Sequence, residues 1–257
     1  MINTSQKKIS HLLRSLGLKR NDTVMFHVSS FSFGKIENGI EGFFNVCKKI
    51  VGEEGNIIVP TFTYSFRRNK IFDVINTPSY PLIGKFPELV RLKKDSYRSI
   101  DPIFSIACYG PQKKDLMKRD NINCFGNDSI YDRLFKKNIL IINLGISYTT
   151  GCTAFLHLEK LAKVFYREDK YFYGKTIDYN GNLINDKAIH FIRKNEIFKS
   201  FVINREKVGR ILEEKKISKC IKYGYGKHLS MRFIPFGETV INILKKNPNA
   251  MLAKINE

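Results

Sequence analysis

Two ionisable side chains near the middle of the sequence, His157 and Glu159, are of the types that transfer protons between substrates. An imidazole has an unperturbed pKa of about 6.5, so it exchanges protons near neutral pH, and a carboxylate can orient it. Both lie in a predicted helix that follows a buried strand, and open α/β sheets bind ligands where their strands end. Residues two apart on a helix do not face each other, so Glu159 is expected to flank the ring.

Two other roles remain open for this segment. A helix histidine that is hydrogen-bonded within the core fits the residues alone better than catalysis does. Covalent transfer, with Cys152 or Ser29 as the nucleophile and His157 as the base, is a third chemistry. Cys152 lies on another face of the helix, and the sequence has no Gly-x-Ser-x-Gly turn, so direct transfer is the simpler mechanism.

Two loops that follow predicted strands, 29–32 and 61–65, are rich in hydroxyl groups. If the strands are parallel neighbours, both loops open at one edge of the sheet. Their backbone N–H groups and hydroxyls can then surround a phosphate or a thioester carbonyl. Serine and threonine are also ordinary turn residues, and each loop by itself favours that simpler role.

Apolar periodicity predicts alternating strands and helices, which is typical of a parallel crossover unit in an α/β protein. The long segment 67–98 is polar and contains several prolines, and we expect an excursion over the sheet edge that either binds a ligand or only connects. The other predicted elements are helices 5–17, 39–51, 84–92, 113–118, 201–214 and 238–246, strands 23–28, 56–59, 104–109 and 139–145, and a hairpin around 175–183. We expect a single domain over 1–257.

Composition limits the class of protein. The 257 residues are 43% hydrophobic, no apolar run is long enough to cross a bilayer, and the start of the chain lacks the apolar core of a secretion signal, so we expect a cytoplasmic protein. Five scattered cysteines without a Cys-x-x-Cys pair predict reduced thiols and no metal site. The net charge of +20 favours anionic partners, although base composition of the genome explains a Lys-rich and Asn-rich chain equally well.

Four blocks of residues, in order, resemble the aminoglycoside 3-N-acetyltransferase family. They are 26–34, 52–63, 101–105 with Gly110, and 144–145 leading to Thr153, His157 and Glu159. The resemblance implies a three-layer α/β/α fold. With the elements predicted above, we expect a central mixed, largely parallel sheet and an added C-terminal hairpin. It also implies transfer of an acetyl group from acetyl-CoA to an amine, without a metal.

Residue roles follow from the resemblance. His157 is the expected catalytic base and Glu159 its flanking carboxylate. The expected acetyl-CoA contacts are His27, Ser29, Ser30, Ser32, Gly34, Thr61, Phe62 and Thr63. The expected acceptor contacts are Tyr64, Asp101 and Ser105. Asp101 stands where many drug-modifying members have a histidine, and Asp-Pro sequences commonly turn or cap the chain, so either role is open for it.

Charge favours one acceptor over another. Aminoglycosides are polycations, whereas a nucleotide-linked amino sugar carries phosphates and suits a chain of +20 better. We therefore expect an N-acyltransferase acting on an amino sugar destined for surface polysaccharide, with an aminoglycoside 3-N-acetyltransferase that confers antibiotic resistance as the alternative. A basic nucleic-acid-binding protein is a remote alternative, because Lys and Arg form no dense stripe in the sequence. The oligomeric state, including a homodimer, is open.

Overall fold

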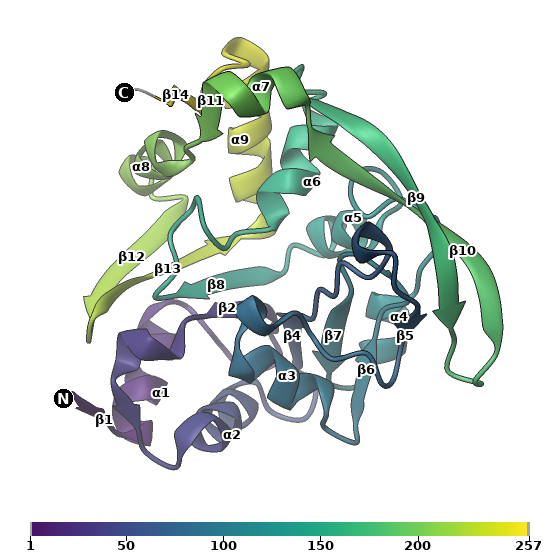
Figure 1. Cartoon of the computed structure of the whole chain (residues 1–257). Helices are drawn as coiled ribbons and strands as arrows, with labels where there is room; N and C mark the ends of the chain where they lie inside the picture. Colours follow the sequence, from purple (N-terminus) through teal and green to yellow (C-terminus); the bar gives the residue numbers. More distant parts are fainter. Residues whose placement is uncertain (1, 256–257) are drawn as a thin grey trace.

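A computed structural model describes residues 2–255, apart from the side chain of Phe198. Within this range the largest sheet has seven strands, which cross the middle of the molecule (Figure 1). Their order is β12 (Ser218–Tyr223), β13 (Gly226–Arg232), β8 (Leu140–Leu144), β2 (Thr23–Val28), β4 (Asn56–Pro60), β7 (Ile106–Tyr109) and β6 (Ser96–Arg98).

The expected mixed sheet is confirmed, but parallel pairing is confined to its centre. Strand β2 pairs in parallel with β4 on one side and with β8 on the other, while β7, β6, β13 and β12 are antiparallel to their neighbours. The carboxyl ends of β2, β4 and β8 therefore meet at one edge, as the crossover pattern predicts.

Helices cover both faces of this sheet, which gives the expected three layers (Figure 1). The first face carries α1 (Gln6–Ser15), α2 (Gly39–Val51) and α3 (Lys85–Arg91). The second face carries α5 (Ile130–Lys136), α6 (Ala154–Leu161), α8 (Glu206–Glu214) and α9 (Phe233–Lys246). Shorter helical segments are α4 (Lys113–Met117), α7 (Asn195–Ser200), η1 (Ser30–Phe33), η2 (Phe66–Arg68) and η3 (Pro81–Ile83).

Alternation along β2 decides which core each residue enters. Val24, Phe26 and Val28 point into the core beneath α1 and α2, whereas Met25 points into the core on the opposite face. His27 has the same parity as Met25, so its ring lies on the face that α6 covers. The alternation of side chains along β2 thus places the His27 imidazole at the carboxyl edge of the sheet, on the face covered by α6, the helix that carries His157.

The expected hairpin is confirmed. Strands β9 (Arg167–Ile177) and β10 (Leu183–Arg193) pair along their whole length and, with β5 (Phe72–Asp73), form a separate sheet that projects from the body (Figure 1). Two further small sheets pair β1 (Asn3–Thr4) with β3 (Lys35–Ile36) and β11 (Phe201–Ile203) with β14 (Leu252–Lys254).

The C-terminal third differs most from the sequence prediction. Gly224 and Tyr225 form the tight turn between β12 and β13, two strands that the sequence did not predict and that extend the main sheet. The helix predicted over 201–214 is divided into β11 and α8, and α5 was not predicted. His190, in the hairpin sheet, is buried against Phe104, whereas His11 on α1 is exposed.

Three glycines surround Ser32, which explains the glycine-rich turn. A Cβ on Gly145 would lie 2.3 Å from the Cβ of Ser32, and one on Gly224 would lie 2.2 Å from the Ser32 carbonyl oxygen. Gly226 approaches the same side chain, and Gly145 and Gly224 both have positive φ angles. The loops after β2 and β8 and the β12–β13 turn therefore pack against one another through Ser32.

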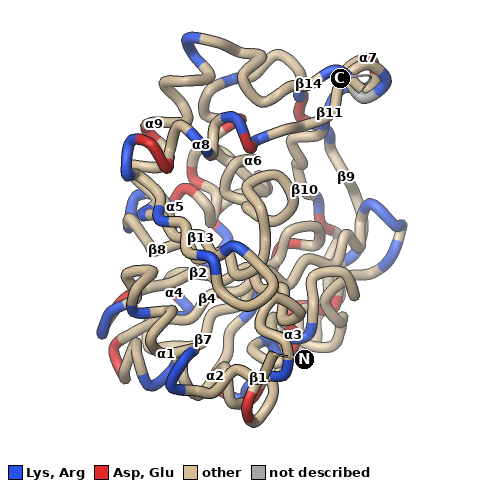
Figure 2. The backbone as a smooth tube through the Cα atoms, turned by 90° about the vertical axis from the view of Figure 1, so that its left-hand side faces the viewer, with Lys and Arg blue, Asp and Glu red and all other residues tan. Residues whose placement is uncertain are grey.

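Lys and Arg positions are scattered among Asp and Glu over the face seen in Figure 2, without a continuous basic stripe. In the described part of the chain, no helix combines the length and apolar character needed to cross a membrane. No group of three or more His, Cys, Asp or Glu in that part is arranged to hold a metal ion. All five cysteines are free thiols.

Candidate active site

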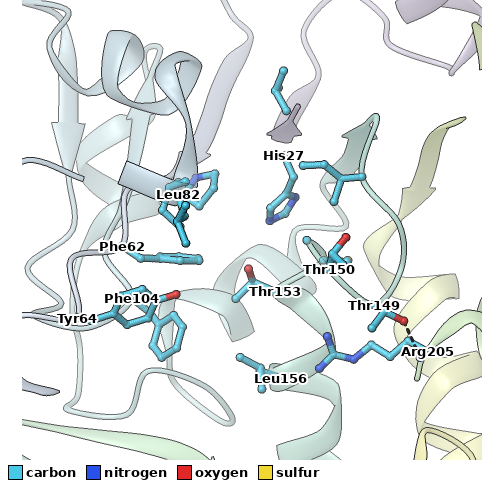
Figure 3. A pocket seen from close by; sticks show the side chains of 16 residues that line it. His27, Phe62, Tyr64, Leu82, Phe104, Thr149, Thr150, Thr153, Leu156 and Arg205 are labelled. Atoms are coloured by element: carbon cyan, nitrogen blue, oxygen red, sulfur yellow. Dashed lines mark hydrogen bonds between the residues drawn. The ribbon is translucent and has the colours of Figure 1, made fainter. Parts of the chain in front are cut away.

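A cavity of about 250 Å³ opens at the carboxyl ends of β2, β4 and β8 (Figure 3). Strand β2 contributes His27 and Val28, strand β4 ends in Pro60, and the loop after β8 supplies the segment from Thr149 to Thr153. This is the sheet edge at which open α/β folds bind ligands. The remaining lining residues are Phe62, Tyr64, Leu82, Ile83, Phe104, Ile146, Leu156 and Arg205.

One wall of the cavity is aromatic. The rings of Phe62 and Phe104 meet edge to face with centroids 5.0 Å apart, and Tyr64 packs on Phe104 at 5.5 Å. Leu82 and Ile83, from the excursion over 67–98, also line the cavity, and Leu82 lies next to Phe62 (Figure 3). The excursion therefore contributes to the cavity, and its apolar side chains suit an uncharged part of a ligand.

His27 is the histidine that lines the cavity. The residue is 4% exposed, and neither ring nitrogen has a hydrogen-bond partner among the described residues. Burial lowers the pKa of His27 to about 4, and the neighbouring Asn143 side chain, opposite it in the β2–β8 register, opposes this shift. At neutral pH the ring is uncharged and one of its nitrogens has a free lone pair.

His157 lies elsewhere. It is fully buried, and its ring packs between Phe135 and Phe233, with centroids 5.7 and 5.8 Å away. Its Nδ1 accepts a hydrogen bond from the Gly126 N–H at 3.2 Å. Burial lowers the pKa of His157 to about 4, while the negative charge of Asp132 opposes this shift. His157 is not among the residues that line the cavity, and Leu156, one position earlier on α6, is.

Glu159 has partners other than His157. Its Oε2 is 2.9 Å from Nε of Arg167 and 3.1 Å from Nη2 of Arg205, and its Oε1 accepts a hydrogen bond from the Tyr166 hydroxyl at 3.0 Å. The carboxylate is fully buried. Glu159 therefore belongs to an ion cluster behind the cavity, and these partners among the described residues do not include His157.

The hydroxyl-rich loop after β4 is engaged internally. Arg98 is buried and donates from Nε to the hydroxyls of Thr61 and Ser105 and from Nη2 to the Thr61 carbonyl. The Thr63 hydroxyl donates to the Pro102 carbonyl at 2.9 Å. These groups anchor the excursion to the sheet, and of this loop only Phe62 and Tyr64, among the predicted contacts, line the cavity.

The loop after β2 and the Asp-Pro turn also fulfil structural roles. The Ser32 hydroxyl donates to the Ser29 carbonyl at 2.7 Å, and Gly34 has a positive φ angle in the turn that follows. Ser29 and Ser30 are half-buried and lie outside the cavity lining. Oδ1 of Asp101 accepts hydrogen bonds from the backbone N–H groups of 103 and 104, so Asp101 forms the Asp-Pro turn, and its contact with an acceptor stays a prediction.

Sequence reasoning did not identify Arg205. It lies at the N-terminal end of α8, where its backbone N–H donates to the Thr149 hydroxyl at 2.9 Å. Its guanidinium extends toward Thr153 and Leu156 on the cavity floor (Figure 3). No signal in the sequence connects this residue with a loop more than fifty positions earlier, because only the packing of α8 brings them together.

These features define a three-layer α/β protein with a ligand cavity at the carboxyl edge of its central strands. The model of the family described as aminoglycoside 3-N-acetyltransferase matches residues 25–245, and the chain belongs to that family.

Three comparisons illustrate the relationship. An aminoglycoside N(3')-acetyltransferase-like protein YokD of Bacillus subtilis is 24% identical over 57% of this chain and 62% of its own length. Aminoglycoside N(3)-acetyltransferase IX of Micromonospora chalcea is 25% identical over 62% of this chain and 63% of its own. The chain thus spans slightly less than two thirds of these relatives. A structure described as AAC-IIIb binary with CoASH has the same fold, with a TM-score of 0.80 at 16% identity over 95% of this chain and 97% of that one.

Proposed function

We propose that this protein is an acetyl-CoA-dependent N-acetyltransferase that acylates the amine of an amino sugar. The observation that supports it most directly is the cavity at the carboxyl edge, which carries an uncharged and unpartnered imidazole in a member of this family. The structure of a relative with the same fold is described as a complex with CoASH, which supports coenzyme A as the acyl carrier.

The cavity residues suit direct transfer. An amine nitrogen attacks the thioester carbonyl carbon, the C–S bond breaks, and the amine loses one proton. We assign this proton to His27, which can return it to the departing CoA thiolate. The hydroxyl of Thr153, on the cavity floor, is suited to donate to the carbonyl oxygen as negative charge develops there.

A covalent route through Cys152 fits the structure less well. The thiol lines the cavity, but burial raises its pKa to about 11, with the positive charge of Arg205 opposing this shift. A thiol in this state is almost entirely protonated at neutral pH and is a weak nucleophile. His157, the base predicted from the sequence, lies on α6 but is buried in the core and does not line the cavity. We therefore assign the proton transfer to His27 instead.

The names of the relatives favour an aminoglycoside over a nucleotide-linked sugar as the acceptor. A role in surface polysaccharide, a cytoplasmic location and a homodimer remain predictions from the sequence.

The proposal is tested by mixing the purified protein with acetyl-CoA and separate panels of aminoglycosides and nucleotide-linked amino sugars, and by following the release of CoA thiol. We expect release that depends on an amine and yields an N-acetylated product by mass spectrometry. Each acceptor with its amine already acetylated is the matched control. Acetyl-CoA binding without release for any amine would contradict N-acetyl transfer to these classes, and release with only one panel identifies the acceptor class.

A further inference from the structure

Arg205 is a buried cation at the floor of the cavity. The residue is 7% exposed, and its guanidinium carbon lies 4.9 Å from the centre of the Phe155 ring, over its face. The hydrogen bond from its backbone N–H to the Thr149 hydroxyl fixes the start of its side chain. The guanidinium is therefore held in place before any ligand arrives, and the entropy cost of using it in binding is low.

Its charge is only partly compensated within the protein. Glu159 is the carboxylate that Arg205 contacts, and the same Oε2 atom also binds Arg167. Two guanidinium groups thus share one carboxylate, and these three side chains, all at least nine-tenths buried, carry a net charge of +1. The positive charge of Arg193 also acts on Glu159 and Arg167 and adds to this excess. Nε of Arg205 is buried without a hydrogen-bond partner in the described part of the chain. Excess charge of this kind is costly unless an anion completes the cluster.

The cavity itself supplies no such anion. Within residues 2–255, those that line the cavity include neither Asp nor Glu, and His27 is neutral at pH 7. The nearby carboxylate of Glu206 accepts a hydrogen bond from the Thr149 backbone N–H at 2.9 Å and is not among the lining residues. Asp101 is similarly engaged in its own turn.

We propose that Arg205 forms an anion subsite of the active-site cavity, which binds a phosphate or carboxylate group of a bound substrate. This inference rests on the proposed function, because it identifies a chemical group that one of the two substrates must carry. A guanidinium is suited to this role because its N–H groups match the geometry of a carboxylate or phosphate, and a buried site is screened little by salt. The anion belongs either to the acceptor, as an acidic amino sugar, or to coenzyme A.

Binding measurements separate these two sources. Calorimetry on the purified protein compares glucosamine 6-phosphate with glucosamine, and acetyl-CoA with S-acetylpantetheine, which lacks the phosphates. The variants are Arg205→Gln, Arg205→Lys to keep the charge, and Arg167→Gln as the matched control, since Arg167 binds the same carboxylate but does not line the cavity. Circular dichroism confirms folding of each.

We expect the wild type to bind the phosphorylated member of one pair at least tenfold more tightly. Arg205→Gln should abolish that preference and Arg205→Lys should retain part of it. Arg167→Gln lowers the positive charge of the cluster but keeps the guanidinium at the cavity, so it should reduce the preference less than Arg205→Gln does. Loss of the preference in the sugar pair assigns the anion to the acceptor, and loss in the thioester pair assigns it to coenzyme A.

Equal binding of both members in both pairs by the wild type overturns the inference, as does a preference that Arg205→Gln leaves intact. If Arg205→Gln does not fold, Arg205→Lys provides the test, because the inference predicts a partial loss of the preference in that variant and an undiminished preference overturns it. An anion preference without CoA release for any amine would refute the proposed function but not the subsite. CoA release without the preference would refute the subsite alone.

Discussion

Replacing each of two buried histidines separately distinguishes a catalytic ring from a structural one. His27→Gln removes the imidazole that lines the cavity, and His157→Phe removes the one that packs between Phe135 and Phe233. If His27 accepts the amine proton, its loss should lower kcat/KM about 10²- to 10⁴-fold, the contribution of a positioned base. This corresponds to about 3 to 5 kcal/mol of transition-state stabilisation.

The two substitutions should affect stability in the opposite order. No ring nitrogen of His27 has a partner among the described residues, so His27→Gln breaks no hydrogen bond within the protein. His157→Phe retains the ring packing but leaves the Gly126 N–H, which donates to Nδ1, without its acceptor. An unsatisfied buried N–H costs about 1 to 3 kcal/mol. At about 2 to 4 °C per kcal/mol in a chain of this size, Tm should fall by about 2 to 12 °C.

The assay measures CoA thiol release at saturating acetyl-CoA over a range of acceptor concentrations, with a melting curve for every preparation. We expect His27→Gln to be nearly inactive with Tm close to that of the wild type. We expect His157→Phe to melt earlier while retaining activity within about tenfold when assayed well below its Tm. A folded but inactive His157→Phe, together with an active His27→Gln, would refute this assignment and support the base predicted from the sequence.

Three further substitutions test the packing. Glu159→Gln leaves two buried guanidiniums without their carboxylate, so urea denaturation should show a loss of about 3 to 5 kcal/mol, and unchanged stability would contradict the ion cluster. Gly145→Ala should lower the free energy of unfolding by about 1 to 3 kcal/mol more than Gly181→Ala. Both glycines have positive φ, but only a Cβ at position 145 would meet a neighbour, the Cβ of Ser32 at 2.3 Å. Equal losses would mean that backbone strain alone is responsible. Burial lowers the pKa of His190 to about 3 and that of His157 to about 4. As the pH falls below about 6.5, these histidines bind protons in the unfolded chain but not yet in the folded one, so the free energy of unfolding decreases as the pH falls toward 4. His190→Phe should therefore flatten the urea midpoint plotted against pH, and an unaltered slope would show that this ring does not contribute.

Local elements could be predicted where the pattern of apolar residues matches a single regular structure. The strand over 23–28 and the helix over 39–51 have the predicted bounds. The strand is a short, largely apolar run that follows the turn residues Asn21 and Asp22, and the helix repeats its apolar residues every three to four positions. The hairpin around Asn180 and Gly181 is also confirmed. It could be predicted because such a turn needs a residue that adopts positive φ, as Gly181 does. The β12–β13 hairpin was not predicted. Its strand β13 pairs with β8, which lies about 80 residues earlier in the chain, so its place in the main sheet depends on a long-range contact.

The sequence by itself determined the family, the alternation of strands and helices, and the sheet edge at which the cavity lies. Only the tertiary structure decided which side chains line that cavity. Neighbouring residues of a helix point about 100° apart, so the rotation of α6 against the sheet places Leu156 at the cavity and His157 in the core. Long-range packing likewise engages the Thr61 hydroxyl with Arg98 and brings Arg205 to the floor, because neither contact is encoded by spacing along the chain.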